Sequence, residues 1–248
     1  IDLGVLGNCK DTLKAVTALI DETKHSSWSN GFEPYKEKEY NKVISKALYP
    51  TEGPLLMGEV VNKVTEASGN EAILVTDVGQ NQLFACRYFK FTKPRSIVTS
   101  GGMGTMGFAL PAAIGATFGA PERTVCMFCG DGGLQMTMQE LGTIMEQQCP
   151  VKMILLNNNY LGNVRQWQEM FFNRRYSFTP MANPDYELIA KGYGIPARTV
   201  VDRAELDDAI REMLSTPGPY LLQCAIKEED NVLPMTPPGA DVDKMLLE

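Results

Sequence analysis

The chain has 248 residues, of which 44% are hydrophobic and 21% charged, so it can form one substantial α/β domain of ordinary composition. The formal net charge of −7 argues against a nucleic-acid or anionic-membrane partner, because either would favour clustered Lys and Arg, and none is visible. No run reaches the roughly 18 apolar residues of a membrane span. We therefore expect a soluble protein.

Its six cysteines lie mostly in apolar stretches, which suits the reducing cytoplasm.

The first 44 residues differ in sequence pattern from the rest of the chain. Residues 8–22 carry apolar side chains at helical spacing behind a polar cap, which predicts a helix. Residues 23–41 are polar and aromatic without a period, so they are the best candidate for an interdomain linker. The start at Ile1, which is similar to the tail of a strand, suggests a fragment of a longer protein. We expect one unit over residues 1–44 and the main domain over 45–248.

From about residue 54 onward, apolar strands alternate with helices. The pattern predicts strands at 72–76, 97–99, 124–129, 151–156, 197–201 and 220–226, and helices at 55–67, 105–118, 134–148, 184–193 and 204–214. Strands that are apolar throughout require a parallel sheet covered on both faces. We therefore expect a three-layer αβα sandwich with a mainly parallel sheet. In such sheets ligands bind beyond the carboxyl ends of the strands.

The sequence argues against catalytic, redox or metal-binding roles for histidine and cysteine in this chain. Cys126 and Cys129 match a C-x-x-C pattern, but they lie in a predicted strand, where residues three apart point to opposite faces. Core packing is therefore favoured over a redox or metal role. His25 is the only histidine, which argues against His-based catalysis or a His-rich metal site.

Gly130-Asp131-Gly132 follows a predicted strand and precedes a predicted helix. The glycines allow a tight turn that exposes backbone amides, as at a phosphate site. A carboxylate there would repel a phosphate unless a cation lay between them. The motif therefore predicts a divalent metal that bridges Asp131 and an anionic ligand.

The next strand ends in Asn157 and Asn158. Because two adjacent strands of a βαβ unit end side by side, Asp131 and Asn158 can face one ion. A plain structural interpretation stays open for each motif alone, since Gly-Asp-Gly is common in turns and Asn tolerates left-handed backbone. Together, the two motifs favour a metal–phosphate site.

This pair of motifs resembles the signature of thiamine-diphosphate enzymes. Four further segments narrow the resemblance to the acetohydroxyacid (acetolactate) synthase catalytic subunit: residues 77–82, 99–116, 160–168 and 232–239. The similarity runs from about residue 45 to the C-terminus, and the preceding segment is similar to the end of that family's central domain. The resemblance therefore implies a thiamine-diphosphate-binding fold over residues 45–248.

The resemblance also implies roles for individual residues. Asp131, Asn158 and the carbonyl of Tyr160 look like Mg²⁺ ligands. Gly104 would accept a hydrogen bond from the pyrimidine amino group, and Met106 would lie under the bent cofactor, although a plain core methionine is the alternative. The expected cofactor-binding residues are Val78, Gly79, Gln80, Asn81, Gly104, Met106, Asp131, Gly132, Gly133, Asn158, Tyr160, Leu161, Gly162 and Asn163.

Trp167 matches the family's tryptophan that favours a larger second keto acid, although by itself it would be interpreted as a partly buried aromatic. Arg165 is either part of a solvated face or functional. Two residues depart from the family pattern, since Asn81 stands where many relatives have His, and Asn163 where many have Met. Contacts to the diphosphate and to the reacting carbon are therefore expected to differ.

The activity implied by the resemblance is decarboxylation of pyruvate and its joining to a second 2-keto acid, pyruvate or 2-ketobutyrate, in branched-chain amino acid biosynthesis. Its expected cofactors are thiamine diphosphate and Mg²⁺, with FAD in the parent enzyme. The expected assembly is a homodimer or larger homo-oligomer with the site between subunits, and a small regulatory subunit is a further candidate partner. The activating glutamate lies on an N-terminal domain in this family, so we expect no catalytic residue here and an inactive fragment.

Two alternatives stay open at this point. The first is another thiamine-diphosphate enzyme, a pyruvate oxidase or a 2-keto acid decarboxylase, which Gln166, Trp167 and the proline-rich tail disfavour. The second is a non-catalytic cofactor-binding module.

Overall fold

The computed structural model describes residues 1–248 and contains two compact units, residues 1–40 and 41–248. The first unit holds three short helices without a buried residue, α1 (Cys9–Thr17), α2 (Ser26–Asn30) and α3 (Glu33–Glu39). Asn8 caps α1 as predicted, because its side-chain oxygen accepts a hydrogen bond from the Lys10 amide at 3.0 Å.

The structure differs from the expected irregular linker at residues 23–41, where α2 and α3 form. Pro34 in the first turn of α3 supplies a helical φ, and Lys36 reaches Glu33 one turn earlier at 2.7 Å. A π-helical turn, Tyr40–Ile44, and the short helix α4 (Ser45–Leu48) follow. Local side-chain contacts of this kind give helices without any apolar period.

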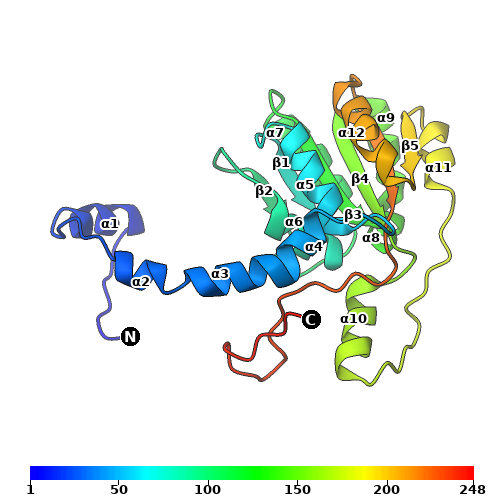
Figure 1. Ribbon diagram of the computed structural model, residues 1–248. Coiled ribbons are helices and arrows are strands. Elements are labelled where there is room, and N and C mark those ends of the chain that lie inside the picture. The colour runs from blue at the N-terminus through cyan, green and yellow to red at the C-terminus, as the bar shows by residue number, and fades with distance from the viewer. The chain divides into compact units, whose positions relative to one another are not determined.

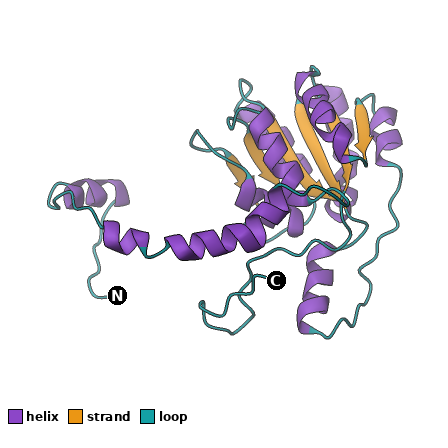
Figure 2. Ribbon diagram, in the orientation of Figure 1, coloured by secondary structure: helices purple, strands orange, loops and turns teal.

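The second unit is built on a sheet of six parallel strands in the order β2-β1-β3-β4-β6-β5 (Figure 2). The strands are β1 (Ile73–Thr76), β2 (Ile97–Thr99), β3 (Val125–Gly130), β4 (Val151–Asn157), β5 (Ala197–Val200) and β6 (Tyr220–Ala225). Each lies within a residue of its predicted range at either end. The prediction of a parallel sheet is confirmed.

Helices cover both faces of the sheet, so the three-layer sandwich is confirmed (Figure 1). One apolar core is formed against α5 (Met57–Ala67), α6 (Gln80–Tyr88) and α12 (Leu206–Ser215). The other is formed against α7 (Ala109–Gly119), α8 (Asp131–Thr137), α9 (Leu141–Gln147) and α11 (Tyr186–Gly192). The remaining helix, α10 (Gly162–Phe171), and short 3₁₀ turns at Met138–Glu140 and Arg203–Glu205 complete the chain.

The two strand cysteines point to opposite faces of the sheet, as predicted. Cys126 belongs to the core under α5, α6 and α12, whereas Cys129 belongs to the core on the other face. Burial raises the pKa of Cys126 to about 12 and that of Cys129 well above its usual value. Both thiols are therefore core residues.

Several helices begin elsewhere than the apolar pattern predicts. α7 begins at Ala109 instead of Thr105, because Gly107 takes a left-handed φ of +83° and the chain turns there. α8 begins at Asp131 itself, and its continuation into α9 is interrupted at Thr137, whose hydroxyl donates to the Gly107 carbonyl at 2.9 Å. α6 and α10 were not predicted. These four helices surround the carboxyl ends of β1, β3 and β4.

None of the helices combines the length and the hydropathy that crossing a bilayer requires.

Candidate cofactor site

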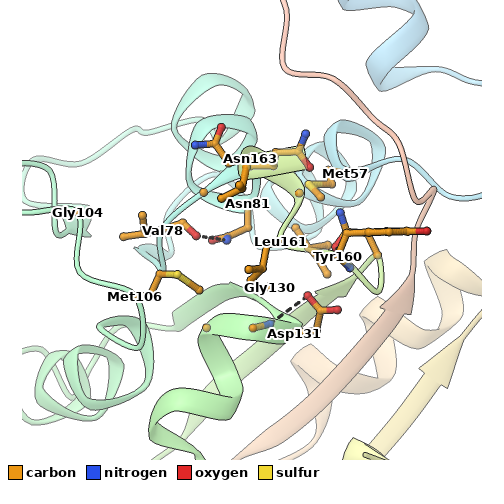
Figure 3. Close-up of a pocket in the computed structure, with 18 residues that line it drawn as sticks. Met57, Val78, Asn81, Gly104, Met106, Gly130, Asp131, Tyr160, Leu161 and Asn163 are labelled. Atoms are coloured by element: carbon orange, nitrogen blue, oxygen red, sulfur yellow. Dashed lines mark hydrogen bonds between the residues drawn. The ribbon is translucent and has the colours of Figure 1, made fainter. Parts of the chain in front are cut away.

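A cavity of about 230 Å³ lies at the carboxyl edge of the sheet (Figure 3). Because all strands are parallel, the segments after β1, β3 and β4 meet at this edge. Every residue expected to bind cofactor lines the cavity, together with four that were not expected, Met57, Gly130, Leu156 and Val164. The motifs that are far apart in sequence therefore share one site.

Asp77, which follows β1, holds the backbone turn that leads into α7. Its carboxylate is 1% exposed and accepts hydrogen bonds from the Gly107 amide at 3.2 Å and the Ala109 amide at 3.0 Å. These bonds fix the turn before α7, which carries Gly104 and Met106 into the cavity. No role was predicted for Asp77 from the sequence. Its position directly after a buried strand is the signal that could have identified this residue.

The glycines of the site leave room that side chains would fill. Gly79 has a φ of +108° at the start of α6, a conformation that other residues rarely adopt. A Cβ on Gly132 would come within 3.4 Å of Met106 and closer to Leu161. Close approach of backbone to a ligand is the usual reason for such a cluster of glycines.

Asp131 is a buried carboxylate with an exposure of 1%. One oxygen accepts from the Gly132 amide at 3.0 Å, and the other accepts from the side-chain nitrogen of Asn183 at 2.7 Å. Burial raises the pKa of Asp131, while the hydrogen bonds from Asn183 and Gly132 oppose that shift. A cation beside this carboxylate would offset the loss of hydration.

The two asparagines after β4 have different positions. Asn158 lines the cavity, and its side-chain oxygen accepts from the Tyr160 amide at 3.3 Å. Asn157 points away from the cavity, where its oxygen accepts from the Asn159 amide at 3.1 Å and closes the turn. Asn159 has a left-handed φ of +58°. Asn158 is therefore the residue that is placed to contact a ligand.

Four amide side chains that line the cavity each leave one buried polar atom without a hydrogen-bond partner. These atoms are Gln80 Oε1, Asn81 Oδ1, Asn158 Nδ2 and Asn163 Oδ1. An unpartnered buried polar atom costs about 1–3 kcal/mol, so such a group indicates a polar ligand. The residues present fit a phosphorylated cofactor with a metal.

The structure contains no group of three His, Cys, Asp or Glu side chains that could hold a metal ion. Asp131 is the only carboxylate that lines the cavity. Mg²⁺ is often held by one or two carboxylates with other oxygens and substrate phosphates. This donor set suits such an ion when the ligand supplies phosphate oxygens.

Trp167 and Arg165, both on α10, do not line the cavity. Trp167 is 39% exposed and packs edge to face against Phe171 at 5.3 Å between ring centroids. The Arg165 guanidinium lies between two aromatic rings, 4.2 Å from the centroid of Tyr160 and 3.9 Å from that of Tyr176, and pairs with Glu229. Arg165 therefore ties α10 to the loop that carries Tyr160, so it is not a solvated surface residue.

The chain is similar to acetolactate synthases. It is 42% identical to the acetolactate synthase isozyme 2 large subunit of Escherichia coli (strain K12), over 78% of this chain and 35% of that protein. It is 38% identical to acetolactate synthase 2, chloroplastic, of Nicotiana tabacum, over 97% of this chain and 38% of that protein. The corresponding values for acetolactate synthase 1, chloroplastic, of Oryza sativa subsp. japonica are 35%, 99% and 40%. The chain thus spans about two-fifths or less of these relatives.

Residues 77–224 match the family described as thiamine pyrophosphate enzyme, C-terminal TPP binding domain, where TPP is another name for thiamine diphosphate. The match begins at Asp77, includes Asp131 and Asn158, and ends in β6. It includes every residue that lines the cavity except Met57. The chain belongs to the thiamine-diphosphate enzyme family and contains its C-terminal cofactor-binding domain.

Proposed function

We propose that the chain is the C-terminal part of an acetolactate synthase large subunit, a transferase that decarboxylates pyruvate and joins the product to a second 2-keto acid. What carries the proposal is the cavity at the sheet edge, whose buried carboxylate and unpartnered amides suit a phosphorylated cofactor with a metal. The alignment of almost the whole chain with proteins of that name supports the particular activity.

In this proposal Asp131, Asn158 and the backbone carbonyl of Tyr160 hold Mg²⁺. All three residues line the cavity, and all three can offer oxygen atoms, which Mg²⁺ prefers. The raised pKa of Asp131 supports the assignment, because the buried carboxylate lacks a compensating charge. The diphosphate of the cofactor completes the coordination of the ion.

The diphosphate contacts Val78, Gly79, Gln80 and Asn81 at the start of α6, and Gly132 and Gly133 at the start of α8. Backbone N–H groups at such turns bind anions without requiring a basic side chain. The carbonyl of Gly104 accepts from the pyrimidine ring, and Met106 packs under the cofactor. Leu161, Gly162 and Asn163 form the remaining wall.

Thiamine diphosphate, when bound, supplies the electron sink for the decarboxylation. The residues of this chain hold and orient it, and the apolar side chains of Met57, Met106 and Leu156 exclude water from the cavity. The activating glutamate lies outside this chain, on an N-terminal domain, so the fragment alone is inactive. Trp167, partly exposed on α10, contacts the second keto acid, pyruvate or 2-ketobutyrate.

The proposal extends to the parent protein. Residues 1–44 are the end of a central domain with its linker, and residues 45–248 form the cofactor-binding domain. The parent binds FAD and forms a homodimer or larger homo-oligomer, with the site between subunits and with a regulatory subunit as a further partner. It acts in the cytoplasm in branched-chain amino acid biosynthesis. The alignment of relatives across residues 1–44 supports this organisation.

The activity is tested by incubating the full-length parent with pyruvate, thiamine diphosphate and Mg²⁺. We expect 2-acetolactate as the main product, and 2-aceto-2-hydroxybutyrate when 2-ketobutyrate is added. Aldehyde or peroxide without acetolactate would favour a decarboxylase or an oxidase instead. No turnover of any 2-keto acid would favour a non-catalytic module.

The metal assignment is tested by calorimetry with thiamine diphosphate and Mg²⁺. We expect Asp131→Ala to lose most of the Mg²⁺-dependent affinity, because the only carboxylate in the cavity is removed. If the variant bound the metal–cofactor pair as tightly as the unmodified chain, Asp131 would not be a ligand.

A further inference from the structure

Asn183, in the loop before α11, contacts both halves of the candidate metal site. Its side-chain nitrogen lies 2.7 Å from Asp131 Oδ2 and 3.1 Å from each of Asn157 Oδ1 and Asn159 Oδ1. Asp131 follows β3, and the two asparagines flank Asn158 at the end of β4. One amide group thus spans the gap between the segments that carry two of the proposed metal ligands.

The orientation of this amide is fixed from its other side. Its oxygen accepts from Gln135 Nε2 at 2.9 Å and from the Tyr186 hydroxyl at 3.0 Å. The Tyr186 ring is 1% exposed, and its hydroxyl also lies 3.1 Å from the Asp131 carbonyl. Since two donors hold the amide oxygen, the amide nitrogen must face Asp131.

This contact determines how Asp131 can meet a cation. The carboxylate has about four acceptor positions. Asn183 occupies one on Oδ2, and the Gly132 amide occupies one on Oδ1. Both oxygens are therefore anchored, so the plane of the carboxylate cannot rotate freely about its terminal bond.

We propose that Asn183 is the positioning residue of the metal site, which orients the Asp131 carboxylate and sets its separation from Asn158 for a divalent cation. The inference rests on the proposed function in that Asp131 and Asn158 are taken as the ligands. Asn183 itself contacts no ligand in this role, because its nitrogen is a donor and cannot bind a cation.

The contacts around Asn183 also stabilise the loop after β4, so a purely structural role must be separated from a positioning role. The Met181 amide donates to the Asn159 carbonyl at 2.9 Å, and the Leu161 amide donates to the Thr179 carbonyl at 2.9 Å. These backbone bonds hold the loop without Asn183. Loss of its side chain should therefore alter metal binding more than the fold.

The test compares Asn183→Leu, of similar size, with three other variants of the same chain. Tyr186→Phe keeps the core ring and removes the hydroxyl, which holds the Asn183 amide and also lies against the Asp131 carbonyl. Asn231→Leu is the matched control, because Asn231 donates to the carboxylate of Glu169 at 3.1 Å, away from the metal site. Asp131→Asn removes the negative charge of the proposed ligand. Each substitution is made in the full-length parent, Mg²⁺ is titrated by calorimetry in the presence of thiamine diphosphate, and unfolding temperatures are measured without ligand.

We expect Asn183→Leu to weaken Mg²⁺ binding by about 10–100-fold, the usual effect of losing a residue that orients a metal ligand. Tyr186→Phe should weaken it less, in the same direction, and Asn231→Leu should leave it within about twofold. With Mn²⁺ in place of Mg²⁺, the electron paramagnetic resonance spectrum of the bound ion should change in Asn183→Leu. A merely structural role would not change that spectrum.

The outcomes separate the inference from the proposed function. If the unmodified full-length parent bound no Mg²⁺ with thiamine diphosphate, or if Asp131→Asn bound it normally, the metal site itself would be wrong. If Asp131→Asn lost Mg²⁺ while Asn183→Leu bound it within twofold and with the unmodified Mn²⁺ spectrum, Asn183 would have no positioning role. If Asn183→Leu does not fold, Tyr186→Phe decides in the same way.

Discussion

Gly133 lies against the Asp77 carboxylate and has no room for a side chain. A Cβ there would lie 2.3 Å from Asp77 Oδ1 and 2.6 Å from its Cγ. Asp77 cannot easily move, because it holds the Gly107 and Ala109 amides. We expect Gly133→Ala to lower the free energy of unfolding by about 1–3 kcal/mol, the usual cost of overpacking. Denaturant unfolding followed by circular dichroism measures this change.

Gly115 provides the control for this substitution. It lies in α7, and a Cβ there would meet nothing within 4 Å. Gly115→Ala should raise the stability by about 0.5–1 kcal/mol, because alanine loses less backbone entropy in a helix. Equal stability of the two variants would mean that Asp77 relaxes at no cost.

Residues of the site differ in how far the sequence could predict them. The cavity-lining glycines and Asp131 were found because they lie in contiguous motifs with a clear resemblance. Asn183 was missed because its importance depends on contacts with Asp131 and Asn157, 52 and 26 positions earlier in the chain. Spacing in sequence does not report such contacts. Met57 was missed for the same reason, since it reaches the cavity from the start of α5.

At the scale of elements, the side chain of Gln166 makes a buried contact between α10 and the C-terminal segment. Gln166 is 1% exposed, and its oxygen accepts from the Val232 amide at 3.0 Å and from Gln80 Nε2 at 3.0 Å. Its nitrogen donates to the Val232 carbonyl at 3.1 Å. The same side chain therefore connects α10, the tail and the start of α6.

We expect Gln166→Leu to lower the free energy of unfolding by about 1–3 kcal/mol, because backbone groups of Val232 lose their partners. Hydrogen exchange should accelerate at Val232 more than in β4. Gln168→Leu is the matched control on the same helix, where Gln168 makes the same pair of backbone bonds to Ser177 at the surface. If both variants lowered the free energy of unfolding by a similar amount, the buried position of Gln166 would have no special role.

Two helices that were not predicted, α6 and α10, begin at the cavity. α6 is polar and begins at a glycine with a left-handed φ, and its buried Gln80 and Asn81 face the site instead of an apolar core. α10 has a single buried residue, Gln166. Apolar periodicity identifies helices that cover a core along their whole length. Only the later residues of α6, Phe84, Ala85 and Tyr88, pack in a core, so periodicity identified neither helix. The strands were predicted well because both of their faces are buried.

At the scale of the whole molecule, the sequence predicted the second unit far better than the first. The sheet and its two covering layers follow from apolar strands alternating with amphipathic helices. The helices within residues 1–40 bury no residue, so no apolar face reports where they begin and end. For α1 the cap at Asn8 and the apolar spacing that follows it were the available signals, whereas α2 and α3 have no side-chain cap.

The second unit also contains a half-buried carboxylate outside the cavity. Asp230 follows β6, accepts from the Met57 amide at 3.3 Å at the start of α5, and accepts through its carbonyl from Gln80 at 2.9 Å. Burial raises the pKa of Asp230 to about 6, although Met57 and Lys227 oppose the shift. In the unfolded chain the same carboxyl titrates near its usual value of about 3.9.

This difference predicts a pH dependence of global stability. The folded chain binds more protons than the unfolded chain between about pH 4 and pH 6, so the contribution of Asp230 is greatest below this window and is lost as the pH rises through about 6. Asp230→Asn keeps an acceptor for Met57 and removes the charge. We expect it to gain stability relative to the parent between about pH 4 and pH 7, by about 1–3 kcal/mol. Urea unfolding at several pH values measures the difference, with Asp241→Asn, in the exposed tail, as the baseline. A constant difference across this range would show that Asp230 titrates alike in both states.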